Sequence, residues 1–202
     1  MKREGLIMII SAPSGAGKTT LCRELRSRFP AMRESISYTT RTPRAGEVDG
    51  KDYCFVSPAE FQAMVAEDAF AEWAEVHGNL YGTALKTLDE ARKNGVDLLL
   101  DIDCQGALTL KEHFQGGVYV FILPPSMEEL RRRLENRSSD ASEVIERRIK
   151  RASDEIKEAR WYDYIIINDR FEVAIEELSA IVLAQNHRTF RMLGQVAKLF
   201  DI

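Results

Sequence analysis

Short apolar runs alternate along the chain with longer segments of helical pattern. The apolar runs are continuous and rich in β-branched and aromatic residues, as in strands that are buried on both faces of a parallel sheet. They cover residues 6–10, 96–102, 118–123 and 164–167. A loop and helix at 15–28 and helical patterns at 126–136, 141–160 and 171–188 complete the alternation. This order predicts an α/β fold, a parallel sheet core with helices on both faces.

Two stretches depart from the alternation. Residues 35–84 hold short strand-like pieces around one helix, which the capping box Ser57-Pro-Ala-Glu60 opens. Residues 126–160 form a helical insert with ten Arg and Lys residues, opened by the similar pattern Ser126-Met-Glu-Glu129. We therefore expect one core with two excursions. The core takes residues 1–34, 85–125 and 156–202, and the excursions take 35–84 and 126–155.

Composition limits the class of protein. A chain of 202 residues with 45% hydrophobic and 30% charged residues is typical of one globular domain. Its formal net charge of −4 argues against a nucleic acid or a membrane surface as partner. The cysteines, Cys22, Cys54 and Cys104, are scattered and indicate reduced thiols. No apolar run approaches a membrane span, and the first strand-like run begins too early for a signal peptide, so we expect a cytoplasmic protein.

A phosphate-binding loop, or P-loop, follows the first strand-like run. Glycines allow successive backbone N–H groups to face an anion, and the following helix adds the positive end of its dipole. Lys18 can reach the β- and γ-phosphates of a nucleotide, and the Thr19 hydroxyl can coordinate Mg²⁺. Alanine replaces the usual first glycine of the motif. The residues expected to bind the nucleotide are Ala12, Pro13, Ser14, Gly15, Ala16, Gly17, Lys18, Thr19 and Thr20.

Acidic residues end the second apolar run. Asp101 and Asp103 lie where ligands bind in open α/β sheets, at the carboxyl end of a strand, and Asp101 is the expected acidic partner of the metal. The segment Asp103-Cys-Gln-Gly106 also matches the D-x-x-G motif of GTPases. The chain contains no Asn-Lys-x-Asp motif for guanine, which argues against a GTPase.

The segment 35–53 indicates a second phosphate site. Arg41 and Arg44 lie three residues apart among hydroxyl groups and a tyrosine, and two guanidinium groups can grip a phosphate by bidentate contacts. With a P-loop some 20 residues upstream, this pattern predicts a protein that handles two phosphorylated molecules.

These motifs together resemble one family. The run from Ser37 to Tyr53, with Glu72-Trp73, Tyr81-Gly-Thr83 and Asp101-Ile-Asp-Cys-Gln-Gly106, closely resembles guanylate kinases of the bacterial cytosolic type. The resemblance covers about residues 5–187. It implies a P-loop kinase core, a GMP-binding lobe at 35–84 and a mobile lid at 126–155. It also implies that ATP and GMP give ADP and GDP, with Mg²⁺.

The resemblance also assigns roles around GMP. Arg41, Arg44, Tyr53 and Tyr81 would bind its phosphate. Glu72 would accept hydrogen bonds from the ring N–H and the amino group of guanine, two adjacent donors that adenine lacks on that edge. Ser37 and Thr83 would contact O6 and N7, and Asp103 would lie near the exocyclic amine.

The lid and the adenine side carry further assignments by resemblance. Arg133, Arg137 and Arg148 match positions where the family has arginines facing the transferred phosphate, and with Lys18 and Arg41 they are the expected catalytic residues. Most basic residues of such a helix are solvated ion-pair partners. Arg137 stands between Asn136 and Ser138, where the family usually has glycines. Asn168 resembles the family's adenine-side edge.

Two alternatives stay open from the residues. One is a non-catalytic interaction module of guanylate kinase type, which the intact P-loop argues against. The other is a kinase for a different nucleoside monophosphate. The segment 188–202 could form a helix that packs on the core or on a second subunit, and the sequence leaves open whether the chain is a monomer or a homo-oligomer.

Overall fold

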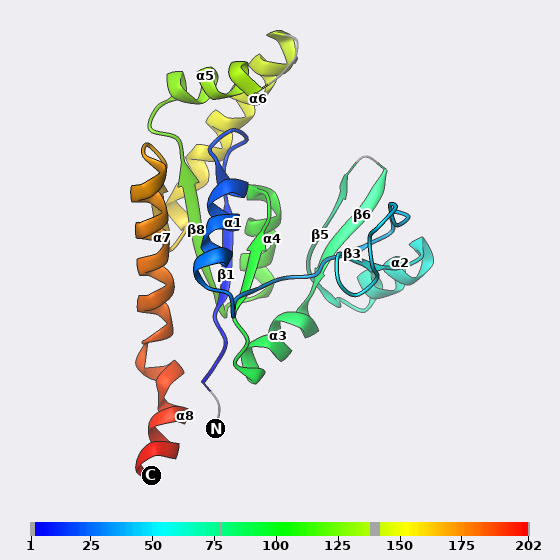
Figure 1. Ribbon diagram of the computed structural model, residues 1–202. Helices are drawn as coiled ribbons and strands as arrows, with labels where there is room; N and C mark the ends of the chain where they lie inside the picture. The colour runs from blue at the N-terminus through cyan, green and yellow to red at the C-terminus, as the bar shows by residue number, and fades with distance from the viewer. Residues whose placement is uncertain (1–2, 77, 138–141, 202) are drawn as a thin grey trace.

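The computed structural model describes residues 3–76, 78–137 and 142–201 of the chain (Figure 1). The main sheet has five strands, all parallel, in the order β2-β7-β1-β8-β9. Its strands are β2 (Arg33–Glu34), β7 (Leu98–Asp101), β1 (Ile7–Ser11), β8 (Gly117–Leu123) and β9 (Tyr164–Ile167). The predicted α/β fold is confirmed, and the short edge strand β2 was not predicted.

Strand β1 feeds two hydrophobic cores because successive side chains point to opposite faces of a sheet. Leu6, Met8 and Ile10 join one core, and Ile7 and Ile9 join the other. Helices α1 (Lys18–Arg28) and α7 (Phe171–Asn186) cover the first face, and α3 (Leu85–Asn94) and α4 (Cys104–His113) cover the second. Helices therefore lie on both faces, as the sequence predicts.

A second, smaller sheet lies beside the core (Figure 1). Its order is β4-β3-β6-β5, with β3 parallel to β4 and antiparallel to β6. Helix α2 (Pro58–Ala66) packs on it through Phe61, whose ring stacks on Phe70 at 4.4 Å between centroids. The strands are β3 (Tyr38–Thr39), β4 (Cys54–Phe55), β5 (Phe70–Val76) and β6 (Asn79–Ala84).

Two helices form the basic insert above the carboxyl end of the main sheet (Figure 1). They are α5 (Met127–Arg137) and α6 (Ser142–Lys157), and their shared core holds Leu130, Leu134, Ile145 and Ala152. Ser138, next to Arg137, lies outside the described residues, so the segment Asn136-Arg-Ser138 is described only in part.

The prediction of one helix over 141–160 is wrong at the C-terminal end of that range. Helix α6 ends at Lys157, and a 3₁₀ turn, η1 (Glu158–Trp161), follows. Trp161 stacks on Tyr162 at 3.8 Å, and Tyr162 stacks on Phe121 of β8 at 4.5 Å between ring centroids. Burying these rings on the sheet ends the helix, because the chain must turn inward at this point.

The segment left open by the sequence forms a helix, α8 (Thr189–Phe200), beside the N-terminal end of the chain (Figure 1). Arg191 is its buried residue, whereas Leu193, Leu199 and Phe200 are exposed. None of the helices in the described parts of the chain has the length and apolar character needed to cross a membrane.

The predicted capping box of α2 is confirmed. The Ser57 hydroxyl accepts the Glu60 N–H at 3.2 Å, and the Glu60 carboxylate accepts the Ser57 N–H at 2.8 Å. At the second predicted box, Ser126 accepts the Glu129 N–H, but the Glu129 carboxylate pairs with Arg132 and Arg133. A guanidinium partner thus draws the carboxylate away from the cap position.

Replacing Ser57 by alanine removes this cap, and we expect the free energy of unfolding to fall by about 1 kcal/mol. Denaturant unfolding followed by circular dichroism measures the change. Ser27→Ala in the exposed part of α1 is the control, and alanine should not destabilise a helix there. Equal losses in both variants would contradict the cap.

Candidate functional site

The P-loop connects the end of β1 to the first residue of α1. Gly15 and Gly17 both have φ of +96°, a left-handed conformation that side chains strongly disfavour. A Cβ atom at Gly17 would lie 2.4 Å from Nδ2 of Asn168, and one at Gly15 would lie 2.9 Å from Leu130. The predicted need for glycine at both positions is therefore visible in the backbone and in its surroundings.

Asn168 supports the loop from behind. Its Nδ2 donates to the carbonyl oxygen of Ala16 at 2.8 Å, and the residue is buried. At the start of the loop, the Ser11 hydroxyl is hydrogen-bonded to the phenol of Tyr162. Both ends of the loop are thus held by side chains from the β9 side of the sheet. The sequence suggested Asn168 but gave no signal for Tyr162.

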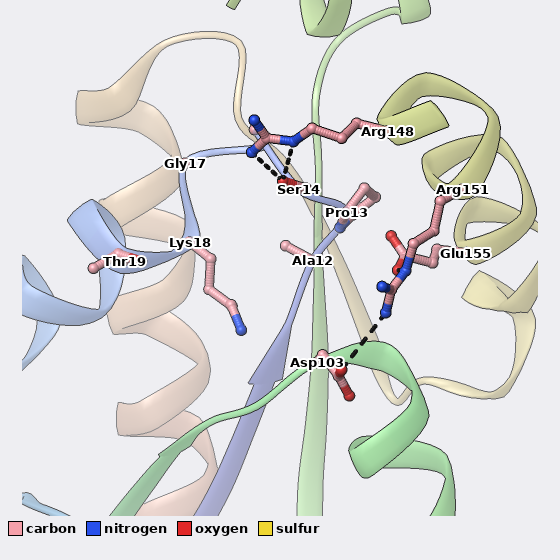
Figure 2. A pocket seen from close by; sticks show the side chains of 11 residues that line it. Ala12, Pro13, Ser14, Gly17, Lys18, Thr19, Asp103, Arg148, Arg151 and Glu155 are labelled. Carbon is pink, nitrogen blue, oxygen red and sulfur yellow. Dashed lines mark hydrogen bonds and ion pairs between the residues drawn. The ribbon is translucent and has the colours of Figure 1, made fainter. Parts of the chain in front are cut away.

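A cavity of about 450 Å³ opens beside the loop (Figure 2). Figure 2 shows Arg148 and Arg151 reaching from α6 toward it. Arg148 donates to the Ser14 hydroxyl at 2.7 Å, and Arg151 lies 3.7 Å from Asp103. Residues of the loop, of α6 and Asp103 line it: Ala12, Pro13, Ser14, Gly15, Gly17, Lys18, Thr19, Asp103, Arg148, Arg151 and Glu155.

Sequence reasoning missed Arg151 and Glu155. They form an ion pair at 2.9 Å, and burial raises the pKa of the Glu155 carboxyl, against the effect of Arg151. The signal was present in the spacing, since Arg148, Arg151 and Glu155 are three and four residues apart and so share one face of a helix.

Lys18 is paired with acceptors on the neighbouring strand end. Its Nζ lies 2.5 Å from Oδ1 of Asp101 and donates to the carbonyl oxygen of Ile102 at 2.6 Å. Thr19 is exposed and lines the same cavity as Lys18. Of the two residues predicted to hold the metal, Asp101 contacts Lys18 directly and Thr19 shares its cavity.

The predicted lid arginines have different surroundings. Arg133 pairs with Glu129 at 2.7 Å and donates to the carbonyl oxygen of Asn168 at 2.9 Å. It lines another cavity, of about 370 Å³, with Thr20, Asn136 and Asn168 among its neighbours. The side chain of Arg137 lies outside the described part of the structure. Of the two whose side chains are described, Arg148 is the one that lines the cavity with Lys18.

A larger cavity, of about 700 Å³, lies between the main sheet and the smaller sheet. Of the predicted residues, Ser37, Tyr53, Thr83 and Asp101 line it. The other residues predicted for GMP are not in its lining: Arg41, Arg44, Glu72, Tyr81 and Asp103. Because Lys18 lines the 450 Å³ cavity and Asp101 lines this one, their ion pair lies where the two cavities meet.

Arg41 is held in place by a carboxylate that the sequence analysis did not single out. Its Nη2 donates to both oxygens of Glu47, at 2.8 and 3.0 Å, and its guanidinium lies 5.3 Å from the ring centroid of Tyr53. The rings of Tyr53 and Tyr81 are in edge contact at 6.0 Å. Arg44 donates its backbone N–H to Glu47, and the residue is exposed.

Glu72 is a buried carboxyl on β5. Its Oε1 accepts the Thr83 hydroxyl at 2.6 Å. A methyl group added at Gly106 would lie 3.2 Å from Oε2 of Glu72 and 3.4 Å from Oδ1 of Asp103, so the two acids face the start of α4 together. Burial raises the pKa of Glu72, with a smaller contribution from the negative charge of Asp103. Asp103 also caps α4 through the Gly106 N–H at 2.8 Å.

Comparison with known proteins gives the family. A family model described as guanylate kinase matches residues 4–185. The chain is 64% identical to the guanylate kinase of Geobacter metallireducens and 63% identical to that of Geobacter sulfurreducens, over the full length of both proteins. The chain belongs to the guanylate kinase family.

The fold agrees with this family. The crystal structure of the guanylate kinase from Anaplasma phagocytophilum superposes with a TM-score of 0.70 at 36% identity, and the match covers 99% of this chain and 97% of that one. The guanylate kinase resemblance predicted from the sequence is confirmed by these matches.

Because Asn168 lies so close to Gly17, adding one methyl group at Gly17 should disturb the P-loop. Gly17→Ala should combine the cost of a left-handed alanine, about 1–2 kcal/mol, with a collision at 2.4 Å. We expect ATP binding to weaken by about tenfold or more. Calorimetric titration with ATP measures the effect.

Gly50→Ala is the matched control. Gly50 also has a positive φ, +72°, but a Cβ atom there would meet nothing within 4 Å. If both variants bind ATP equally well, the contact with Asn168 does not hold the loop.

Proposed function

We propose that the chain transfers the γ-phosphoryl group of ATP to GMP, with GMP in the 700 Å³ cavity and the phosphates of ATP at the P-loop. The observation that carries the proposal is the junction of the two cavities at the Lys18–Asp101 pair. Phosphoryl transfer requires the attacking and leaving oxygens in line, with positive charge around them. Two phosphate-binding regions that meet at a lysine supply this arrangement.

The phosphate of GMP is assigned to the cluster of Arg41, Arg44, Tyr53 and Tyr81. Glu47 supports the assignment because it orients the guanidinium of Arg41 before any ligand arrives. A preoriented guanidinium loses less conformational entropy when it binds a phosphate. We regard Glu47 as a positioning residue for Arg41.

The guanine base is assigned to Glu72, with Ser37 and Thr83 at O6 and N7 and Asp103 near the amine. A buried carboxylate needs hydrogen-bond donors, and guanine presents two adjacent ones. Thr83 already donates to Oε1 of Glu72, which orients the carboxylate plane. A base without the two donors would leave a buried acceptor unpaired, which disfavours adenine.

The phosphates of ATP are assigned to the P-loop, and its adenine to the side of Asn168. The backbone around Gly15 and Gly17 and the N-terminus of α1 attract anions. Arg148 reaches this cavity from the insert, and Arg151 adds a second positive charge to its wall. These groups, with Lys18 and Arg41, would neutralise the charge that develops on the transferred phosphoryl group.

The donor set fits Mg²⁺ held mainly by phosphate oxygens. Thr19 and Asp101 offer a hydroxyl and one carboxylate, the oxygen ligands that Mg²⁺ prefers. The described residues contain no cluster of three or more His, Cys, Asp or Glu that could hold a metal by itself. When bound, the ion would neutralise phosphate charge. For Asp101 to take part, Lys18 must leave it and turn to the phosphates.

We further propose that residues 35–84 act as a GMP-binding lobe and residues 126–155 as a lid. The separate small sheet with its own Phe61–Phe70 core supports the lobe, and the Leu130–Leu134 core of the insert, in contact with the P-loop near Gly15, supports the lid. Closure of such parts excludes water from the transferred group.

A panel of nucleoside monophosphates tests the function. Release of ADP from ATP is measured with GMP, AMP, CMP and UMP at matched concentration. We expect rapid release with GMP. Rapid release with another base instead indicates a different monophosphate kinase, and no release with any of them indicates an interaction module.

Lys18→Ala removes a positive charge from the junction of the cavities. We expect kcat to fall by roughly 10²–10³-fold, because loss of one electrostatic group at the reacting centre has an effect of this size. Steady-state kinetics measure kcat, and thermal melting checks the fold. Lys86→Ala, on the exposed face of α3, is the control and should keep full activity. Unchanged turnover in the Lys18 variant would overturn its assignment.

Glu72→Gln keeps the size of the side chain but presents one acceptor and one donor where guanine presents two donors. The unpaired group costs about 1–3 kcal/mol, so kcat/KM for GMP should fall roughly 5- to 150-fold. The value for AMP should fall much less, and ATP affinity should stay the same. A parallel loss of ATP binding, or unchanged GMP kinetics, would show that Glu72 does not read the base.

The raised pKa of Glu72 predicts a pH dependence of GMP use. Only the ionised carboxylate accepts both guanine donors, and burial moves its protonation to a higher pH than that of a free glutamate. On acidification, kcat/KM for GMP should therefore fall earlier than a normal carboxyl would allow. A pH profile of the wild type and of Glu72→Gln measures this. The variant lacks the group, so an identical acidic limb in both would assign the titration to another group.

A further inference from the structure

A separate cavity lies at the opposite end of the main sheet from the P-loop. This basal cavity has a volume of about 570 Å³ and is lined by Gly117 and Tyr164, the first residues of β8 and β9, and by residues of α7 and α8. The P-loop follows the other, carboxyl end of the parallel strands. Seven residues of β8 separate the two ends by roughly 20 Å, so the basal cavity is distinct from the proposed kinase site.

Its walls carry an excess of positive charge in a chain whose net charge is −4. Arg92, Arg188 and Arg191 line the cavity, against Glu4 and Asp163. Asp163 is already engaged, because its carboxylate accepts the Tyr119 N–H at 2.8 Å and the Lys111 ammonium at 3.3 Å.

Arg191 is a buried cation with few partners. It is 3% exposed, and Nη1 donates to the carbonyl oxygen of Gly5 at 2.5 Å. Its buried Nε has no hydrogen-bond partner among the described residues. Two carboxylates act on it by charge: Asp97, which is held by Arg3 at 3.0 Å, and Glu4, which is exposed. Arg191 thus forms no direct ion pair among the described residues, and because a buried guanidinium that lacks one is costly, this site favours an anion.

The other two arginines border the same space. A Cβ atom at Gly116, which also lines the cavity, would lie 2.9 Å from Nη1 of Arg92, so that guanidinium rests on the backbone of the cavity wall. Arg188 is exposed at the N-cap of α8, and both Arg188 and Arg191 approach the ring of Phe190, at 5.7 and 5.0 Å. The guanidinium groups thus come from α3 and from the start of α8.

We propose that the basal cavity binds a small molecule bearing two or more phosphate groups, with Arg92, Arg188 and Arg191 as its counter-charges. Guanidinium groups bind phosphates bidentately. Arg92 also pairs with Asp89 at 3.5 Å, whereas Arg188 and Arg191 have no ion pair among the described residues. The volume is in the range of small-molecule sites. Arg188 and Arg191 lie beyond residues 4–185, the part matched by the family model, so two of the three arginines belong to the C-terminal segment.

Calorimetric titration of the full chain with inorganic tripolyphosphate, in the presence of EDTA, tests the proposal. The proposed kinase site, made of the P-loop and the Arg41–Arg44 cluster, provides one set of sites, and we expect a second set in the wild type. Arg188→Glu should weaken the second set by about tenfold or more, because it reverses a charge next to the ligand. Lys198→Glu, the same charge change on the exposed part of α8, should alter it less than about twofold.

Hydrogen exchange locates the second set. Tripolyphosphate should slow exchange in residues 186–200 of the wild type but not in the same residues of Arg188→Glu. Both proteins should keep full kinase turnover. This result separates the test from that of the proposed function. A repeat titration with ADP distinguishes the sources, since tighter binding of ADP at the second set indicates a nucleotide and equal binding indicates phosphate groups alone. A single set of sites in the wild type, or two unchanged sets in Arg188→Glu, would overturn the proposal.

Discussion

Burial of β1 on both faces is the constraint on which the site depends. The strand pairs with β7 and β8 and sends alternate side chains into two cores, so neither its register nor its direction can shift without exposing apolar groups. It therefore delivers Ser11 and the P-loop to one defined point. Asn168 and Tyr162 then hold the two ends of the loop against strands of the same sheet. The position of the phosphate-binding backbone follows from the core.

Much of this arrangement could be predicted because its signals are local. Continuous apolar runs identified four of the five main strands. The glycines of the P-loop predicted a turn that faces backbone N–H groups to an anion, and the structure has positive φ angles at Gly15 and Gly17. Ser57 and Glu60 predicted a helix start because a capping box involves four consecutive residues. The residue types alone were sufficient at these places.

The rest depends on contacts between distant parts of the chain. No sequence feature near Lys18 indicates its pairing with Asp101, which lies 83 positions later. In the sequence, Glu47 resembles any acidic loop residue, and only the structure shows its ion pair with Arg41. The end of α6 could not be placed because the stacking of Trp161 and Tyr162 on Phe121 ends it. The resemblance to guanylate kinases suggested the roles of Glu72 and Arg133, but their different surroundings became visible only in three dimensions.

At the Lys18–Asp101 pair, a phosphate in the first cavity and the carboxylate that lines the second compete for the same ammonium group. A phosphate that recruits Lys18 must displace the carboxylate, so its apparent affinity is lowered in proportion to the fraction of molecules in which the ammonium is free. Any positive group that neutralises Asp101 from the other cavity raises that fraction. Because linkage is reciprocal, a phosphate that recruits Lys18 in the first cavity must favour such a positive group at Asp101 by the same factor. A single ion pair thus couples the binding free energies of two ligands that need not touch each other.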